Sequence, residues 1–207
     1  YEITYGDWSS DVCSSDLSHP DIIVQVIAGD TVLDLATRQA DLAIRFFRPT
    51  SNQLVAAKVG QFNMSVFAAP SYIEQYGLPQ KMDDLREHRI VDHTVLHALP
   101  AMKPWSDIVE RSPSVVLRTN SSYAAMEAVA VGYGISVFPD YSAKMSNLVP
   151  APIDLNIVRD IWLVSHEETN KGARIRTVID YVREQFRQDE REWFSVPAGR
   201  STQVVAA

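Results

Sequence analysis

Two short polar segments follow apolar runs of the sequence, and both contain residue types that bind anions. Arg45 and Phe46 end the run "DLAIRFF", and residues 119–122, "TNSS", follow the run "VVLR". Each run has the length of a buried strand. An arginine guanidinium binds a carboxylate through two parallel hydrogen bonds, and the free backbone N–H groups of a helix that begins after Asn120 would favour an anion. These segments predict a binding site for a small organic acid.

The predicted ligand-binding residues share one location, the carboxyl ends of strands, where open α/β sheets bind their ligands. Phenylalanine at two of these positions would stack on an aromatic ring or on an aliphatic body. The predicted set is Gly29, Asp30, Thr31, Arg45, Phe46, Thr119, Asn120, Ser121, Ser122 and Phe138.

Several of these residues also have a purely structural alternative, which the sequence leaves open. Asn120 and Ser121 are residue types that often serve as helix N-caps. Arg45 would fit equally well in an ion pair between two elements. Gly29 would permit a turn, and Asp30 is a better cap than ligand contact, because its carboxylate would repel an anion.

No catalytic or metal site is predicted. His166 precedes two glutamates, but this group has no compact metal-ligand spacing, and His88, His93 and His97 are too scattered in the sequence to predict a site. The sequence has no G-x-S-x-G, phosphate-loop or G-x-G-x-x-G motif. The glycines of residues 132–134, "GYG", stand between a predicted helix and a predicted strand. We therefore expect no catalytic residues, no cofactor and no enzyme activity.

The composition argues against several other classes of protein. The chain has 207 residues, 26 of them acidic and 19 basic, which gives a net charge of −7. An acidic chain without a Lys/Arg cluster is a poor nucleic-acid binder by itself. A single cysteine allows no disulfide within the chain, and no apolar run approaches the ~18 residues of a membrane span.

Residues 6–17, "GDWSSDVCSSDL", are unlike the rest of the chain and lack the apolar periods of a helix or strand. A common type of sequencing-adapter oligonucleotide would encode these residues in order. We therefore interpret residues 1–17 as a non-native segment and exclude them from fold reasoning. Without its four acidic residues the net charge is −3, from 19 basic and 22 acidic residues.

The apolar patterns predict alternating strands and helices. A strand at 22–28, a helix at 31–40 and a strand at 41–47 would form a parallel βαβ unit. Residues 54–70 are predicted as two extended segments hinged at Gly60. The further predicted elements are helices at 70–77, 82–88, 121–132 and 172–194 and strands at 89–94, 113–120, 133–139 and 159–166.

This order predicts two α/β lobes with a double crossover and a cleft between them. Lobe I would comprise residues 18–60 and 158–194, and lobe II residues 61–157. Residues 195–207 would be a flexible tail.

A resemblance to a known family rests on segments in this order: "DLATRQADLAIRFF", "APSYIEQYGLPQKMDDLREH" and "LRTNSSYAAMEAVAVGYGISVFP". These segments resemble the effector-binding region of LysR-type transcriptional regulators, over about residues 19–194. The resemblance implies an α/β, two-lobed fold like that of type II periplasmic binding proteins, with two crossover strands. The first βα unit and the helix-turn-helix domain of the family are expected to be missing here.

The resemblance also implies a function. The chain would bind a small-molecule effector, with a carboxylate as the expected ligand, and pass the signal to a DNA-binding domain absent from this sequence. Duplex DNA would be bound only through that domain, in the bacterial cytoplasm and without contact to a membrane. The chain would form a homodimer or tetramer, and the helices at 31–40 and 121–132 would supply the contacts. The alternative is a solute-binding protein of a transport system, which would have a similar fold.

Overall fold

The structure of the chain is a computed structural model. It describes residues 22–27, 35, 39–142 and 146–189. The predicted non-native segment, the predicted tail and most of the predicted helix at 31–40 lie outside these residues.

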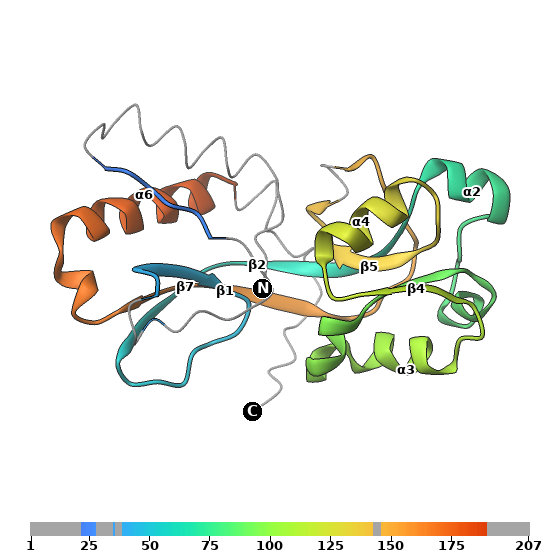
Figure 1. The fold of residues 1–207 in the computed structure, drawn as a ribbon, viewed down its shortest axis with the longest axis horizontal. Helices are drawn as coiled ribbons and strands as arrows, with labels where there is room; N and C mark the ends of the chain where they lie inside the picture. Colours follow the sequence, from blue (N-terminus) through green and yellow to red (C-terminus); the bar gives the residue numbers. More distant parts are fainter. Residues whose placement is uncertain (1–21, 28–34, 36–38, 143–145, 190–207) are drawn as a thin grey trace. The chain divides into compact units, whose positions relative to one another are not determined.

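The chain divides into two compact units. Unit 1 comprises residues 1–62 and 159–195, and unit 2 comprises residues 63–158 and 196–207. The chain leaves unit 1 within strand β2 (Leu54–Ala68) and returns at the start of strand β7 (Val158–His166), so two strands are shared by the units (Figure 1). These are the two crossover strands that the sequence predicts. The predicted hinge at Gly60 is wrong, because β2 continues through this residue.

Unit 1 contains strand β1 (Leu42–Arg45), which pairs with β7 in antiparallel orientation, with Arg45 opposite Trp162. A short 3₁₀ turn, η4 (Thr169–Lys171), leads into helix α6 (Ala173–Asp189), which lies alongside these strands (Figure 1). The apolar period of α6 predicts which side chains it buries. Ile179, Val182 and Phe186 are buried, as are Ile161, Leu163 and Val164 of β7.

The predicted strand at 22–28 is not formed in the described residues 22–27, which belong to no helix or strand. Ile23 is 96% exposed and Val26 is 62% exposed, so this apolar segment has little cover among the described residues. The pairing of β1 also differs from the prediction, since its described neighbour is the antiparallel β7 rather than a parallel strand of a βαβ unit.

Unit 2 contains the parallel pair of β3 (Ile90–His93) and β4 (Val115–Thr119), and helix α4 (Ser122–Ala130) begins shortly after β4. Strands β5 (Ser136–Pro139) and β6 (Val149–Pro150) pair with β2 in antiparallel orientation. In Figure 1, α3 (Lys103–Arg111) and α4 lie on opposite sides of β4. Helix α4 packs against both strands of the ladder.

The other elements of unit 2 are helix α2 (Pro70–Tyr76) and the 3₁₀ helices η1 (Met82–Glu87), η2 (Thr94–Ala98) and η3 (Pro100–Met102). Gly77, with φ of 76°, ends α2 where the sequence predicts. Helix α3 is not among the elements predicted from the sequence. Pro104 lies in the first turn of α3, where a helix needs no backbone donor.

The core of unit 2 is built from aromatic and aliphatic side chains of all these elements. The largest fully buried members are Trp105, Tyr72, Phe67, Leu85, Ile90 and Met102. Within the described part of the chain, no helix combines the length and the apolar character that a membrane span requires.

Candidate functional site

The carboxyl ends of β3 and β4 bring together polar residues that are 25 or more positions apart in the sequence. In the parallel register of the two strands, Asp92 lies opposite Arg118 and His93 lies opposite Thr119. Because successive side chains of a strand point to opposite faces, these two pairs lie on opposite faces of the ladder. The end of the ladder therefore has a His93 face and an Asp92 face.

On the His93 face, the imidazole meets the start of α4. His93 is only 4% exposed, and its Nε2 lies 3.4 Å from the carbonyl oxygen of Asn120 and 3.5 Å from Oγ of Ser122. Oγ of Ser121 accepts a hydrogen bond of 3.3 Å from the backbone N–H of Ala124, and therefore caps the helix. The backbone N–H of Ser121 in turn donates to Oγ1 of Thr119 at 3.1 Å.

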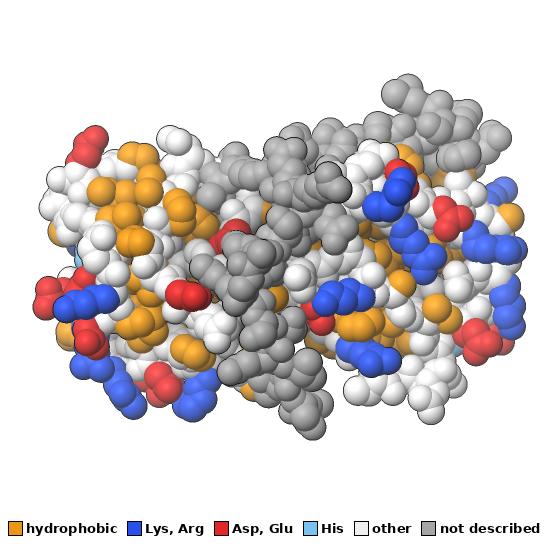
Figure 2. Space-filling view, turned by 180° about the vertical axis from the view of Figure 1, so that it is seen from behind, with side chains coloured by type: hydrophobic (Ala, Val, Ile, Leu, Met, Phe, Trp, Pro, Cys, Tyr) orange, Lys and Arg blue, Asp and Glu red, His pale blue; other side chains and the backbone are white. Residues whose placement is uncertain are grey.

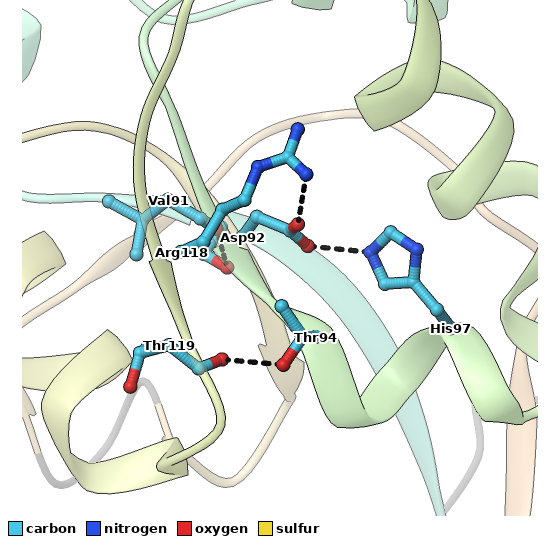
Figure 3. Close-up of polar contacts among 7 residues, drawn as sticks. Val91, Asp92, Thr94, His97, Arg118 and Thr119 are labelled. Atoms are coloured by element: carbon cyan, nitrogen blue, oxygen red, sulfur yellow. Dashed lines mark hydrogen bonds and ion pairs between the residues drawn. The ribbon is translucent and has the colours of Figure 1, made fainter.

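On the Asp92 face, a fully buried carboxylate lies beside two cationic residue types (Figure 3). Oδ1 accepts a hydrogen bond of 2.7 Å from Nε2 of His97, whereas Oδ2 lies 3.7 Å from Nη1 of Arg118, too far for a hydrogen bond. Among the described residues, Oδ2 has no hydrogen-bond partner. A second contact, from Oγ1 of Thr94 to the carbonyl oxygen of Thr119 at 3.2 Å, also fastens η2 to the end of β4.

This arrangement is suited to bind an anion at the end of the ladder. The first backbone N–H groups of a helix have no acceptors within the helix, and its dipole favours negative charge at that end. The Ser122 hydroxyl adds a side-chain donor beside the same helix start, and the His93 imidazole lies 3.5 Å from that hydroxyl. Among the described residues, no group of three His, Cys, Asp or Glu side chains is placed to hold a metal ion.

Four of the predicted ligand-binding residues lie together at this edge of unit 2, namely Thr119, Asn120, Ser121 and Ser122. Ser121 has the structural role that the sequence left open, that of an N-cap. Phe138 lies apart from them in the core of unit 2, 3% exposed and 6.4 Å from the ring of Phe67.

The other described members of the predicted set, Arg45 and Phe46, belong to unit 1. The guanidinium of Arg45 lies 5.6 Å from the centre of the Phe47 ring. The Phe46 ring packs edge-on against Phe62 at 5.0 Å, and its carbonyl oxygen accepts a hydrogen bond from Arg159. The remaining members of the set, Gly29, Asp30 and Thr31, lie outside the described residues.

Four residues of this edge, Asp92, His93, His97 and Arg118, are not in the predicted set. The three histidines at 88, 93 and 97 are too scattered in the sequence to predict a site. They do not form one cluster, because His93 and His97 belong to different faces and His88 bonds to Tyr72 elsewhere in unit 2. One signal was available: His93 is the last residue but one of the predicted strand at 89–94, as Thr119 is of the predicted strand at 113–120.

A family model matches most of the chain. Residues 16–187 match the family described as "LysR substrate binding domain". This match, and the relatives below, confirm the resemblance seen in the sequence. The predicted absence of enzyme activity agrees with this family of regulators.

Two curated relatives show how much of a longer protein the chain represents. An "HTH-type transcriptional regulator" of Xanthomonas campestris pv. campestris is 33% identical over 132 residues, which are 61% of this chain and 38% of the relative. The "HTH-type transcriptional activator AaeR" of Escherichia coli is 27% identical over 123 residues, 58% of this chain and 40% of the relative. The chain thus spans about two fifths of the length of these relatives.

Solved structures share the fold. The regulatory domain of CrgA from Neisseria meningitidis superposes with a TM-score of 0.73 at 18% identity, and the match covers 86% of this chain and 91% of that domain. Full-length AphB of Vibrio cholerae superposes with a TM-score of 0.66 at 18% identity, over 89% of this chain and 65% of AphB. Both confirm the predicted two-lobed α/β fold. Sequence and fold together lead to one conclusion: the chain belongs to the LysR substrate-binding domain family.

Proposed function

We propose that this chain is the effector-sensing part of a DNA-binding transcription regulator, and that the effector is a small organic acid. The carboxylate of the effector would bind at the end of the β3–β4 ladder. The observation that carries the proposal is the convergence of His93, Ser122 and the start of α4 at this edge. Their donors would replace the water that a carboxylate gives up on binding.

The signal would reach DNA through a domain outside this sequence, as the helix-turn-helix in the names of the relatives suggests. An effector changes such a protein only through its different affinities for two arrangements of the units. The protein would act in the cytoplasm. The relatives named as transcription regulators do not favour the alternative of a solute-binding protein.

The regulator would act as a homodimer or tetramer. The outer face of α4 offers exposed side chains for such a contact, including Tyr123 and Glu127. The predicted helix at 31–40, the other proposed contact, lies mostly outside the described residues. Arg45 and Phe46 remain predicted ligand contacts of unit 1.

The test uses the purified chain and named probes: acetate, succinate, benzoate and salicylate. Thermal shift would identify a carboxylate that stabilises the chain, and calorimetry would measure its affinity. His93→Ala and Ser122→Ala should each weaken binding about tenfold, since each removes one hydrogen bond to a charged group. Asn120→Ala and Arg45→Ala test the residues predicted from the sequence.

A matched control is Ser71→Ala, because Ser71 is an exposed serine in the first turn of another helix, α2. It should leave the affinity unchanged. Equal affinity of the parent chain, His93→Ala and Ser122→Ala for the same probe would contradict the proposed site.

A further inference from the structure

A second polar group lies at the edge of unit 2 that carries the proposed effector site. Ile135, the residue before β5, forms a parallel bridge with Ile90 of β3, so β3 and β5 run side by side and end at the same edge. The chain leaves β5 into Asp140. The backbone N–H of Asp140 donates to the carbonyl oxygen of Asn63 in β2 at 2.9 Å, and Nδ2 of Asn63 donates to Oδ2 of Asp140 at 3.1 Å. We call Asn63 and Asp140 the Asn63–Asp140 pair.

The pair lies on the face of the sheet to which His93 also belongs. Counted from the bridge between β3 and β5, His93 is level with Phe138, so these two side chains share a face. Phe138 lies opposite Ser65 of β2, and Asn63 is two residues from Ser65, on the same face. Nδ2 of Asn63 also lies 3.4 Å from Oγ of Ser65. Helix α4 packs against β3, β4 and β5 (Figure 1).

The Asn63–Asp140 pair has unused hydrogen-bond acceptors but no unused donor. Asn63 is 3% exposed, both hydrogens of its Nδ2 are directed to Asp140 and Ser65, and its Oδ1 has no hydrogen-bond partner among the described residues. The orientation of the amide follows from the carboxylate, because the reverse orientation would bring two oxygens together. Asp140 is half-buried, and no cationic side chain of the described chain forms an ion pair with it.

These acceptors disfavour an organic acid that has no further polar group. A carboxylate without a cationic partner repels an anion bound beside it, and a buried oxygen without a donor costs free energy. An ammonium group on the ligand would remove both costs, because it carries positive charge and three N–H donors.

The spacing of the strands suits a ligand in which both charged groups are close together. Neighbouring strands lie about 4.8 Å apart and rise about 3.3 Å per residue, which places the backbone of Asp140 about 8 Å from that of His93. Two hydrogen bonds of about 2.8 Å and a molecule whose carboxylate and ammonium groups share one carbon atom span about the same length.

We propose that the effector is an amino acid, whose ammonium group binds the Asp140 carboxylate and Oδ1 of Asn63 while its carboxylate binds at the start of α4. This inference rests on the proposed function and names the class of acid that the site selects. Asp140 is then the residue that distinguishes amino acids from other organic acids.

The test screens the purified chain against the common amino acids by thermal shift. Calorimetry then compares each stabilising amino acid with its deaminated counterpart, such as succinate for aspartate or 3-phenylpropionate for phenylalanine. The amino acid should bind at least about tenfold more tightly, because the deaminated acid lacks the charge-assisted hydrogen bonds of the ammonium group. This comparison uses the parent chain and requires no variant.

Asp140→Asn provides a second test, because it keeps the size of the side chain and removes its charge. It should weaken binding of the amino acid at least about tenfold, whereas binding of the deaminated acid should be unchanged or tighter. The matched control is Asp83→Asn, which removes the charge of an exposed aspartate of η1 in the same unit and should leave both affinities unchanged. A circular-dichroism melt checks that both variants fold.

The outcomes separate this inference from the proposed function. Failure of every amino acid to bind, or equal affinity of the parent chain for an amino acid and its deaminated counterpart, would overturn the inference. Binding of deaminated acids alone, weakened by His93→Ala, would overturn it and leave the proposed function standing. An amino acid whose binding responds to Asp140→Asn, but not to His93→Ala or Ser122→Ala, would support the ammonium site and contradict the proposed carboxylate site.

Discussion

The carboxylate of Asp92 and the imidazole of His97 lie 2.7 Å apart, and the carboxylate is fully buried at the end of a parallel two-stranded ladder. Arg118, directly opposite Asp92 in that ladder, approaches the other carboxylate oxygen only to 3.7 Å. A buried carboxylate is stable only when its partners replace the lost water. The short hydrogen bond from His97 should therefore offset more of the cost of burying the Asp92 carboxylate than the long contact with the mostly exposed Arg118 does.

This difference predicts unequal costs for two substitutions. His97→Ala should lower the free energy of unfolding by about 3 kcal/mol, because it leaves a buried carboxylate without its hydrogen bond. Arg118→Ala should cost about 1 kcal/mol or less, as for other exposed ion pairs. Urea unfolding monitored by circular dichroism measures both values. A larger loss for Arg118→Ala than for His97→Ala would show that the long ion pair dominates.

The free energy of unfolding should decrease as the pH is lowered, because of His88. Its imidazole is hydrogen-bonded to the hydroxyl of Tyr72, and burial lowers the pKa of His88, although the carboxylates of Asp84 and Glu87 oppose this shift. The unfolded chain then binds more protons than the folded chain between the lowered pKa and the ordinary value of about 6.5. The stability that neutral His88 provides is complete above about pH 6.5 and is lost as the pH falls towards the lowered pKa.

The measurement is urea unfolding of the parent chain and of His88→Gln between about pH 5 and 7.5. The variant should show a smaller loss of stability on acidification, because it removes this titrating group. His166→Gln is the control, since Nδ1 of His166 accepts a hydrogen bond from the backbone N–H of Glu168, two residues further along the chain. Parallel pH curves for the parent and His88→Gln would refute the role of His88.

Two glycines should respond differently to alanine. Gly134→Ala would place a Cβ 2.6 Å from the carbonyl oxygen of Arg89 and 3.2 Å from a methyl of Val91, so the bridge between these segments must open. We expect a loss of about 2 kcal/mol or more, as for other overpacked sites. A Cβ at Gly77 would meet no atom within 4 Å. The cost of Gly77→Ala is therefore only the backbone strain of an alanine at a φ of 76°, about 1 kcal/mol. Thermal melts compare the two, and equal losses would contradict the steric argument.

Ser121 tests the distinction between a cap and a ligand contact. Its hydroxyl accepts from the N–H of Ala124, so Ser121→Ala should cost about 1 kcal/mol of stability, whereas Ser121→Asp should retain most of it. Chemical unfolding measures both. A fully stable Ser121→Ala chain would mean that the capping bond contributes nothing and that the hydroxyl is better explained by ligand binding.

Local residue patterns are sufficient to predict several helices and strands and where they end. The run before Thr119 and the serines after it predict a strand and then a capped helix, and both are present as β4 and α4. The apolar period of α6 identified its buried face, and Gly77 marked the end of α2. These features depend on residues within one or two turns of each other, so local patterns are sufficient to predict them.

The neighbours of each strand and their register depend on contacts between residues that are far apart in the chain. Asp92 meets Arg118, and His93 meets Asn120 and Ser122, because β3 and β4 pair in parallel across an intervening segment that contains α3. A strand pattern shows which side chains share a face but not which strand lies beside it, and a register shift of one residue would exchange the two faces. The same limit explains the error at Gly60, where pairing with other strands keeps β2 continuous.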